Sequence, residues 1–150
     1  MKKERTLILI KPDGMRRGLM GEVMMMFENA KLKLVAAKVV KVSKELAETH
    51  YAMHKGKPFY NGLIEFIQGK KHGENRILAL VYEGENAVKR AREIVGATDP
   101  EKAEPWTIRG KYGRRTTDGE IENVVHASGT PEEGKQEVAL WFKEEEIWKE

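Results

Sequence analysis

The sequence has no cysteine among its 150 residues. This absence excludes a disulfide-stapled secreted domain and a metal site built on thiolates. Long hydrophobic runs are missing too. The apolar run at residues 7–10 is ended by Lys11, so it is much shorter than a signal-peptide core or the roughly 20 residues of a membrane span. We therefore expect a cytoplasmic protein that does not associate with membranes.

Several nucleotide-handling signatures are also absent. The chain has no G-x-x-x-x-G-K-[ST] loop, which argues against a P-loop enzyme. It has neither the H-R-D nor the D-F-G motif of protein kinases. No aromatic cluster of the kind found in RNA-recognition domains occurs. We therefore expect no specific binding of nucleic acid.

The composition that is present fits one soluble domain spanning residues 1–150. Hydrophobic residues make up 40% and charged residues 34% of the chain, a balance typical of globular rather than disordered proteins. The sequence shows no repeat or linker. The formal net charge of +3 is a mild basic bias that suits a phosphate-bearing ligand without requiring one.

Hydrophobic spacing predicts the order of the secondary-structure elements. The strands are expected at residues 6–10, 34–42, 77–82 and 138–142. The helices are expected at residues 19–30, 43–53, 59–68 and 87–95, with a short one starting at the Thr130-Pro131 cap. Residues 97–122 are predicted to be irregular and 143–150 to be a solvated tail. This order predicts an α+β fold, a ferredoxin-like split β-α-β sandwich in which helices cover a four-stranded antiparallel sheet.

Three cationic residues lie at positions where a charge needs an explanation. Arg92 falls on or beside the apolar stripe of the helix at 87–95, so it either reaches solvent or directs its guanidinium at an anion. Arg109 lies in a glycine-containing stretch where it is either solvated or close to a ligand. Lys11 ends a buried strand just before a proline-containing turn.

One histidine, His126, stands between two valines and three small residues at 127–129. The valines favour extended backbone, and the small residues leave the ring accessible. The helix that starts at Thr130 directs an anion-friendly N-terminus to the same region. A lone histidine is most often structural. Beside cationic groups, and without a cysteine nucleophile, this one is a candidate to accept a phosphoryl group.

Two other features leave alternatives open. His50 and His54 are four residues apart and would share one face of a helix, a spacing that can bind metal. No third ligand or H-E-x-x-H glutamate accompanies them, so we predict no metal site on the protein. Phe59 and Tyr60 are either core aromatics or, for one of them, a platform on which a nucleobase stacks.

Seven stretches occur in a characteristic order: ERTLILIKPDG (4–14), RGLMGE (17–22), HYAMHKGKPFYNGL (50–63), VYEGENAVKRAREIVGATDP (81–100), TIRG (107–110), NVVHASGT (123–130) and EVALWF (137–142). With these motifs the chain resembles the nucleoside diphosphate kinases over nearly its whole length. The resemblance implies transfer of the γ-phosphate from a nucleoside triphosphate to a nucleoside diphosphate by a ping-pong route through a phosphohistidine.

The resemblance also implies Mg²⁺ as cofactor, nucleoside tri- and diphosphates as partners, and a homo-oligomer that is either a hexamer or a tetramer. An alternative is a catalytically altered paralogue that acts as a nucleotide- or nucleic-acid-binding regulatory protein. That alternative predicts a broken site, whereas the catalytic positions that can be matched are present.

The catalytic set implied by the resemblance centres on His126 as the nucleophile. Glu137 is expected to hold one ring nitrogen so that the other attacks, with Ser128 as its companion. Tyr51 and Asn123 match positions near the transferred phosphate and the ribose. The full implied catalytic set is His126, Lys11, Tyr51, Asn123, Ser128 and Glu137.

The nucleotide-binding set implied by the resemblance has three parts. Its phosphate-binding positions are Lys11, Arg92, Thr98 and Arg109. Lys11 and Asn123 are implied to touch the ribose 3′-hydroxyl. Phe59 matches the base-stacking aromatic, with Leu63 beside it.

The sequence departs from the family pattern at three single residues and in two segments. Ala127 and Gly129 replace a usual glycine and aspartate, and Trp106 replaces the glycine before the TIRG motif. The segments at 69–76 and 112–122 are longer than is common in the family. We expect phosphoryl transfer to survive these changes.

Overall fold

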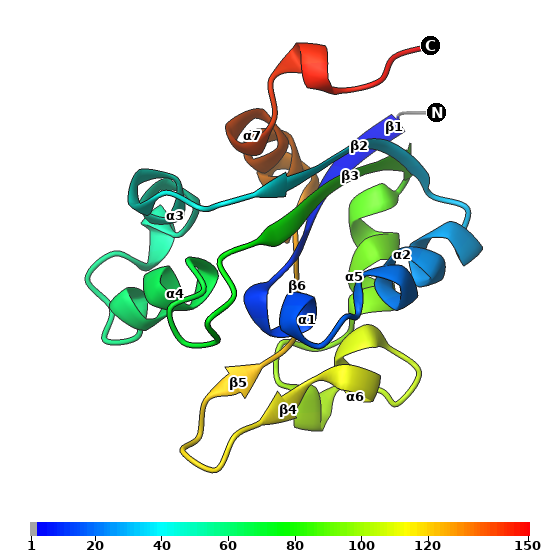
Figure 1. Ribbon diagram of the computed structural model, residues 1–150. Coiled ribbons are helices and arrows are strands. Elements are labelled where there is room, and N and C mark those ends of the chain that lie inside the picture. Colours follow the sequence, from blue (N-terminus) through cyan, green and yellow to red (C-terminus); the bar gives the residue numbers. More distant parts are fainter. Residues whose placement is uncertain (1–2) are drawn as a thin grey trace.

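The computed structural model describes residues 3–150, and its centre is an antiparallel sheet covered by helices (Figure 1). The strands pair in the order β2-β3-β1-β6. Their bounds are β1 (Lys3–Ile10), β2 (Lys33–Val40), β3 (Ile77–Glu85) and β6 (Val125–Ala127). The α+β, ferredoxin-like prediction is confirmed. β1 pairs with β3 on one edge and with β6 on the other, and its residues 7–10 pack against helices on both faces of the sheet, which explains their uninterrupted apolar run.

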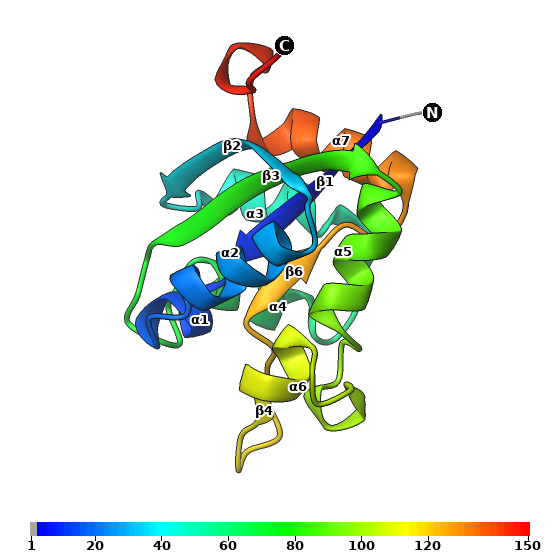
Figure 2. The ribbon, with the colours of Figure 1, turned by 90° about the vertical axis from the view of Figure 1, so that its right-hand side faces the viewer.

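Helices cover both faces of the sheet (Figures 1 and 2). The helices are α1 (Pro12–Arg16), α2 (Met20–Asn29), α3 (Lys44–His50), α4 (Tyr60–Ile67), α5 (Ala87–Val95), α6 (Ile108–Tyr112) and α7 (Pro131–Trp141). Ile8 and Ile10 of β1 pack in the cluster that includes residues of α2 and α5, whereas Leu7 and Leu9 pack in the cluster with α4 and α7. This alternation is the two-residue period of a strand.

The predicted strand at 138–142 is wrong, because these residues form the end of helix α7 and the residue after it. Val138, Trp141 and Phe142 are buried, while the two residues at 139 and 140 are exposed. Spacings of three and four residues belong to a helix face, whereas the aromatic content suggested a strand. The fourth strand of the sheet is β6, which carries the histidine segment.

Two smaller expectations also need correction. The helix predicted at 43–53 ends at His50, and the short 3₁₀ turn η1 (Ala52–His54) follows it. The stretch at 97–122 is not irregular. It contains the 3₁₀ turn η2 (Pro100–Lys102), helix α6 and a hairpin of strands β4 (Arg114–Arg115) and β5 (Ile121–Glu122).

The C-terminal segment 143–150 is a solvated surface segment, as predicted, but one buried residue docks it onto the sheet. It contains the 3₁₀ turn η3 (Glu144–Glu146), and Ile147 is 5% exposed. The backbone N–H of Trp148 donates to the carbonyl of Val35 in β2 over 2.8 Å. Within residues 3–150, no helix has the length and apolar character needed to cross a membrane.

Candidate active site

A short hydrogen-bonded chain fixes the ring of His126. Its Nε2 lies 2.7 Å from Oε1 of Glu137 on α7, and Ser128 Oγ donates to the same oxygen over 2.8 Å. Ser128 Oγ in turn accepts the backbone N–H of Leu7 in β1 over 3.0 Å. Because an ionised carboxylate can only accept, Nε2 carries the proton in this arrangement. A neutral ring then has its lone pair on Nδ1, which is the nitrogen able to act as a nucleophile.

Glu137 is ionised in this setting. Burial raises the pKa of its carboxyl, but the hydrogen bond and charge of His126, together with the Ser128 hydroxyl, outweigh burial and hold the pKa below its usual range. A negative charge at this position stabilises positive charge that the imidazole gains when Nδ1 forms a bond.

A wall of aromatic rings backs the histidine. The ring of His50, at the end of α3, meets that of His126 edge-on at 4.5 Å between centroids. Trp141 Nε1 donates to His50 Nδ1 over 3.1 Å. Burial, followed by the neighbouring His126, lowers the pKa of His50 to about 3, so His50 is neutral near pH 7. Burial and then Glu137 raise the pKa of the Tyr51 phenol, which is therefore a neutral hydroxyl.

The proposed shared metal-binding face of His50 and His54 does not form, because α3 ends between them. His54 turns toward Phe59, with ring centroids 5.3 Å apart. His50, His126 and Glu137 do bring ligand atoms within 4.8 Å of one another. Those atoms include the ones engaged in the hydrogen bonds above, so we assign the cluster to hydrogen bonding.

Arg109 is a buried cation with a donor to spare. Its Nη1 and Nη2 donate to the carbonyls of Gly96 and Val125 over 3.0 and 2.8 Å. Its Nε is buried and has no partner within residues 3–150. Burial, followed by the nearby Arg92, lowers its pKa to about 10, so it stays charged near neutral pH. The sequence placed Arg109 in a loop, whereas it lies in the first turn of α6.

Asn123 also has an unused polar atom. Its Nδ2 donates to the carbonyl of Thr98 over 3.0 Å, which joins the segment after α5 to the segment before β6. Its buried Oδ1 finds no hydrogen-bond partner in the described part of the chain. Buried polar atoms are normally satisfied, so these two orphans indicate that a polar ligand completes the site.

The turn between Asn123 and His126 is strained. Val124 has a φ of 72°, a left-handed value that is rare for a β-branched residue. Asp13 Oδ2 accepts the N–H of Val124 over 2.9 Å, and the backbone N–H of Lys11 donates to the Val124 carbonyl over 2.9 Å. This strain locks the neighbouring side chains into fixed directions. Neither Asp13 nor Val124 is predicted as a site residue from the sequence, although Asp13 stands inside the K-P-D-G turn.

Lys11 is held next to an aromatic ring at the end of β1. Its Nζ lies 4.9 Å from the centroid of the Phe66 ring in α4. Burial, which Asp13 partly opposes, lowers the pKa of Lys11 to about 8, and Arg109 adds to the lowering. Lys11 is therefore a poorly solvated cation that an anionic ligand would stabilise.

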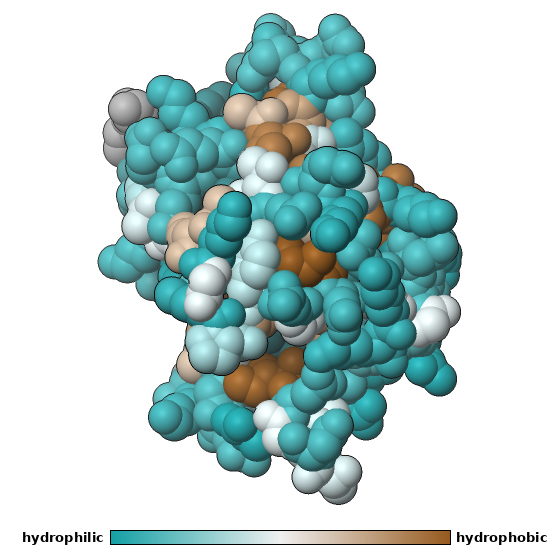
Figure 3. Space-filling view, turned by 90° about the vertical axis from the view of Figure 1, so that its left-hand side faces the viewer, coloured by the Kyte–Doolittle hydropathy of each residue, from teal (hydrophilic) through white to brown (hydrophobic). Residues whose placement is uncertain are grey.

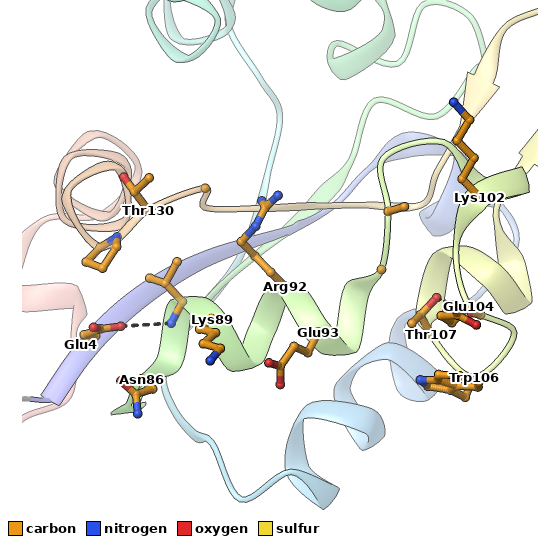
Figure 4. Close-up of a pocket in the computed structure, with 15 residues that line it drawn as sticks. Glu4, Asn86, Lys89, Arg92, Glu93, Lys102, Glu104, Trp106, Thr107 and Thr130 are labelled. Carbon is orange, nitrogen blue, oxygen red and sulfur yellow. Dashed lines mark hydrogen bonds between the residues drawn. The ribbon is translucent and has the colours of Figure 1, made fainter.

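A cavity of about 740 Å³ lies between α5, the segment before α6 and the start of α7 (Figure 4). Arg92 points from α5 into this space, toward the strand that leads to Thr130. The exposed position of Arg92 leaves its guanidinium available to an anion. Among the predicted site residues of the described chain, Arg92 is the one that lines this cavity, so the cavity adjoins the histidine and does not contain it.

Phe59 and Leu63 lie on the opposite side, at the start of α4. Phe59 is 51% exposed, so it is not a core aromatic, whereas Tyr60 packs against the core. Leu63 is half-buried. The face that carries α3 and α4 shows apolar patches among hydrophilic residues (Figure 3). An exposed phenyl ring here suits stacking on a flat ligand.

A family model for nucleoside diphosphate kinase matches residues 4–147. The chain is 49% identical over 144 residues to the nucleoside diphosphate kinase of Carboxydothermus hydrogenoformans, covering 96% of this chain and 91% of the relative. It is 46% identical to the enzyme of Pyrococcus abyssi, covering 97% of this chain and 88% of the relative.

Solved structures agree with these relatives. A halophilic nucleoside diphosphate kinase from Halobacterium salinarum in complex with CDP has a TM-score of 0.89 at 38% identity, covering 99% of this chain and 93% of that one. The Borrelia burgdorferi enzyme, a transition-state mimic with bound vanadate and ADP, has a TM-score of 0.88 at 35% identity, covering 99% and 92%.

Proposed function

The chain belongs to the nucleoside diphosphate kinase family, and we propose that it carries the γ-phosphate from a nucleoside triphosphate to a nucleoside diphosphate on Nδ1 of His126. The observation that supports this role most directly is the 2.7 Å contact between Glu137 and Nε2, which leaves Nδ1 as the reactive nitrogen. The family name of the relatives disfavours the alternative of a regulatory paralogue without catalysis.

The reaction takes two displacements through one site. In the first, the Nδ1 lone pair forms a bond to the γ-phosphorus, and the bond from that phosphorus to the bridging oxygen breaks. The nucleoside diphosphate leaves with the electron pair on that oxygen. In the second, a terminal oxygen of a different nucleoside diphosphate attacks the phosphohistidine, and Nδ1 regains its lone pair. The proton on Nε2 remains hydrogen-bonded to Glu137 throughout.

Three cations neutralise the phosphate charge in our proposal: Lys11, Arg92 and Arg109. Phosphoryl transfer depends mainly on positioning and on charge neutralisation, so fixed cations supply most of what it needs. The unused Nε of Arg109 and Oδ1 of Asn123 are suited to the bound nucleotide. Thr98 and Tyr51 add hydroxyl groups near the phosphates.

The nucleoside is held at two points. We assign contact with the ribose 3′-hydroxyl to Lys11 and Asn123, and stacking on the base to Phe59 with Leu63 beside it. Every base has a flat face, so stacking on Phe59 accepts purines and pyrimidines alike.

A phosphotransferase generally requires a divalent cation, and we propose that Mg²⁺ would arrive with the nucleotide and would neutralise part of its phosphate charge. Mg²⁺ keeps several water ligands and needs few from the protein when phosphate oxygens are available. A metal held mainly by water and phosphate oxygens needs few protein ligands, so the cationic residues around His126 are compatible with it. One oxygen of the Asp13 carboxylate, Oδ2, accepts a hydrogen bond from the N–H of Val124.

We also propose that residues 1–150 form one domain, that this domain assembles as a homo-hexamer or homo-tetramer, and that it works in the cytoplasm. Support for assembly comes from exposed apolar side chains. Leu34 and Val39 on the edge strand β2 are 40% and 59% exposed. Sedimentation velocity on the intact chain tests the oligomeric state directly.

The experiment that tests the proposed function follows the phosphate. Protein incubated with ATP labelled on the γ-phosphate should acquire an acid-labile label, and added GDP should convert that label to GTP. The label should vanish in His126→Ala and persist in His54→Ala, a matched histidine outside the proposed catalytic set. Label that survives in His126→Ala, or none on the folded wild-type protein, would rule the assignment out.

A further inference from the structure

The two segments that are longer than is usual in the family lie against each other. The first, residues 69–76, follows α4, and the second ends in the β4–β5 hairpin at residues 114–122. We propose that His72, from the first segment, is a positioning residue that holds Lys11 and Asn123, the two groups assigned above to the ribose. This inference rests on the proposed function and extends it to a residue outside the family's motifs.

His72 reaches the Asn123 side through the hairpin. Its Nε2 lies 2.7 Å from Glu122 Oε2, and Arg114 Nε donates to the other oxygen of Glu122 over 2.7 Å. Lys71 forms a second ion pair with Glu120. The side chains of His72 and Glu122 are 10% and 7% exposed, so this hydrogen-bonded contact is shielded from water and is stronger than the same contact at the surface. Glu122 directly precedes Asn123 in the chain.

The charge on Glu122 is part of this contact. Burial raises the pKa of its carboxyl, but the hydrogen bonds from His72 and Arg114 outweigh burial and keep the pKa below the usual range. The ionised carboxylate of Glu122, hydrogen-bonded to both His72 and Arg114, fixes the end of β5. The buried Oδ1 of Asn123, which has no protein partner within residues 3–150, is thereby held in place before a ligand arrives.

His72 reaches the Lys11 side through one aromatic ring. The rings of His72 and Phe66 meet edge-on, with centroids 4.8 Å apart and planes at 69°. The Phe66 ring also contacts Lys11, whose Nζ lies 4.9 Å from the ring centroid. A further tie comes from Arg16 of α1, which donates to the His72 carbonyl over 2.8 Å. A desolvated ammonium group has few fixed contacts, so the position of Phe66 determines where it lies.

Comparing acceptors with and without the 3′-hydroxyl measures the contribution of Lys11 and Asn123 separately from the chemistry on phosphorus. If Lys11 and Asn123 bind the 3′-hydroxyl, an acceptor without that hydroxyl is phosphorylated more slowly. Loosening both groups through His72 should reduce this preference. A residue that matters only for folding would change both acceptors by the same factor.

The experiment compares 2′-deoxyguanosine diphosphate with 2′,3′-dideoxyguanosine diphosphate, which differ only in the 3′-hydroxyl. Rates of dephosphorylation of the phosphorylated enzyme are measured by stopped flow for each acceptor. We expect His72→Ala to reduce the wild-type ratio of kcat/KM by roughly three- to tenfold, the effect of coupling between neighbouring groups.

Three further variants keep the test decisive if His72→Ala does not fold. His72→Gln retains an N–H donor for Glu122 but removes the ring from Phe66. Glu122→Gln retains the shape but removes the charge. Each should reduce the ratio in part. Arg76→Ala is the matched control, because Arg76 lies in the same segment, is half-exposed and pairs with Glu74 over 2.8 Å. It should leave the ratio unchanged.

Two outcomes overturn the inference and are distinguishable. A wild-type enzyme that phosphorylates both acceptors equally well refutes the ribose assignment of Lys11 and Asn123, and the role of His72 with it. A wild-type preference that all folded variants of His72 and Glu122 retain in full refutes the role of His72 alone and leaves the proposed function intact.

Discussion

A single hydroxyl group, that of Ser128, connects the central strand to the carboxylate of Glu137. It accepts the N–H of Leu7 and donates to Glu137, and Ser128 is fully buried. Replacement by alanine leaves a buried N–H without an acceptor. We expect Ser128→Ala to lower the free energy of unfolding by about 1–3 kcal/mol and also to slow phosphohistidine formation.

Urea unfolding of Ser128→Ala measures the first effect, with Thr117→Ala as control. Thr117 is exposed in the β4–β5 hairpin, so its replacement should change stability by at most about 0.5 kcal/mol. Equal unfolding midpoints for both variants would show that the Leu7 N–H finds another acceptor.

The depressed pKa of Lys11, about 8, predicts how nucleotide binding depends on pH. Below this value Lys11 is charged and attracts phosphate. Above it the free enzyme has a neutral amine. We expect the affinity for ADP, measured by titration calorimetry, to weaken as the pH rises from 7 to 9.5. Lys11→Arg, which stays charged over this range, should show a flatter profile. Parallel profiles would contradict this role for Lys11.

Lys11 also links pH to stability, in the opposite direction. Its pKa is about 8 in the folded protein and 10.5 as the ordinary value. The folded state therefore loses its proton first, and the stability gained this way is complete above pH 10.5 and lost as the pH falls through 8. We expect Lys11→Met to raise the melting temperature at pH 7 by roughly 2–4 °C, the shift for about 1 kcal/mol in a chain of this size. The gain should shrink at pH 10, and a gain that is the same at both pH values would contradict the buried charge.

The sequence predicts that Glu137 and Ser128 accompany His126, and the structure brings these three together, but the residues that orient them could not be predicted. His126 and Glu137 stand in the motifs NVVHASGT and EVALWF, from which the resemblance implies phosphoryl transfer. Asp13 acts on Val124 from 111 positions away, through a backbone conformation that no local pattern encodes. The spacing of His50 and His54 raises the question of a metal site. Instead, His50 is a neutral ring beside His126, and the burial that keeps it neutral is visible only in the packed structure.

At the scale of elements, long hydrophobic patterns predicted strands and helices correctly, whereas short patterns did not. The runs that became β1, β3 and α5 were predicted to within a few residues, because each buries a continuous stripe. β6 has three residues, which is too short for a period to be recognised. Valine and aromatic residues at 138–142 favoured a strand, and helix α7 formed instead because its buried positions follow a helical spacing.

Helix α7 lies so close to β1 that one of its residues must lack a side chain. A Cβ atom built on Gly134 would stand 2.6 Å from the carbonyl oxygen of Arg5. Alanine normally favours a helix over glycine by about 1 kcal/mol. We expect Gly134→Ala to destabilise nonetheless, by about 1–3 kcal/mol, because the helix must shift away from the sheet.

Gly21 in α2 is the control for Gly134→Ala, since no described atom lies within 4 Å of a Cβ atom added there. Gly21→Ala should stabilise by up to about 1 kcal/mol in the same urea experiment. Stabilisation in both variants would indicate that α7 packs against β1 less tightly than the 2.6 Å distance at Gly134 implies.

At the scale of the whole molecule, the C-terminal segment covers the edge strand. Ile147 is buried beside β2, and Lys38 pairs with Glu146 over 3.0 Å. Lys33 Nζ lies 4.2 Å from the ring of Trp148. This docking cannot be predicted from the sequence, because a highly charged segment with one isoleucine shows no periodic hydrophobic pattern.

Deletion of residues 143–150 should therefore destabilise the fold. Loss of Ile147 burial alone removes roughly 1.5–3 kcal/mol, which lowers the melting temperature by about 5 °C or more. Calorimetry on the truncated chain measures this, and light scattering reports the uncovered β2 edge. Lys149→Ala, which leaves the segment in place, is the control. A melting temperature unchanged by the deletion would mean that the segment is not docked in solution.

The bond from Leu7 to Ser128 spans 121 positions, and it has a consequence for synthesis on the ribosome. At the usual rates of translation the first strand waits roughly 6–24 s for its partner hydroxyl to be made. During that interval Leu7 and Leu9 lack Val138 and Trp141, which later share their core cluster. The nascent chain therefore exposes apolar residues of an incomplete sheet until its last helix emerges, and a chain that ends before Glu137 lacks the carboxylate that fixes the ring of His126.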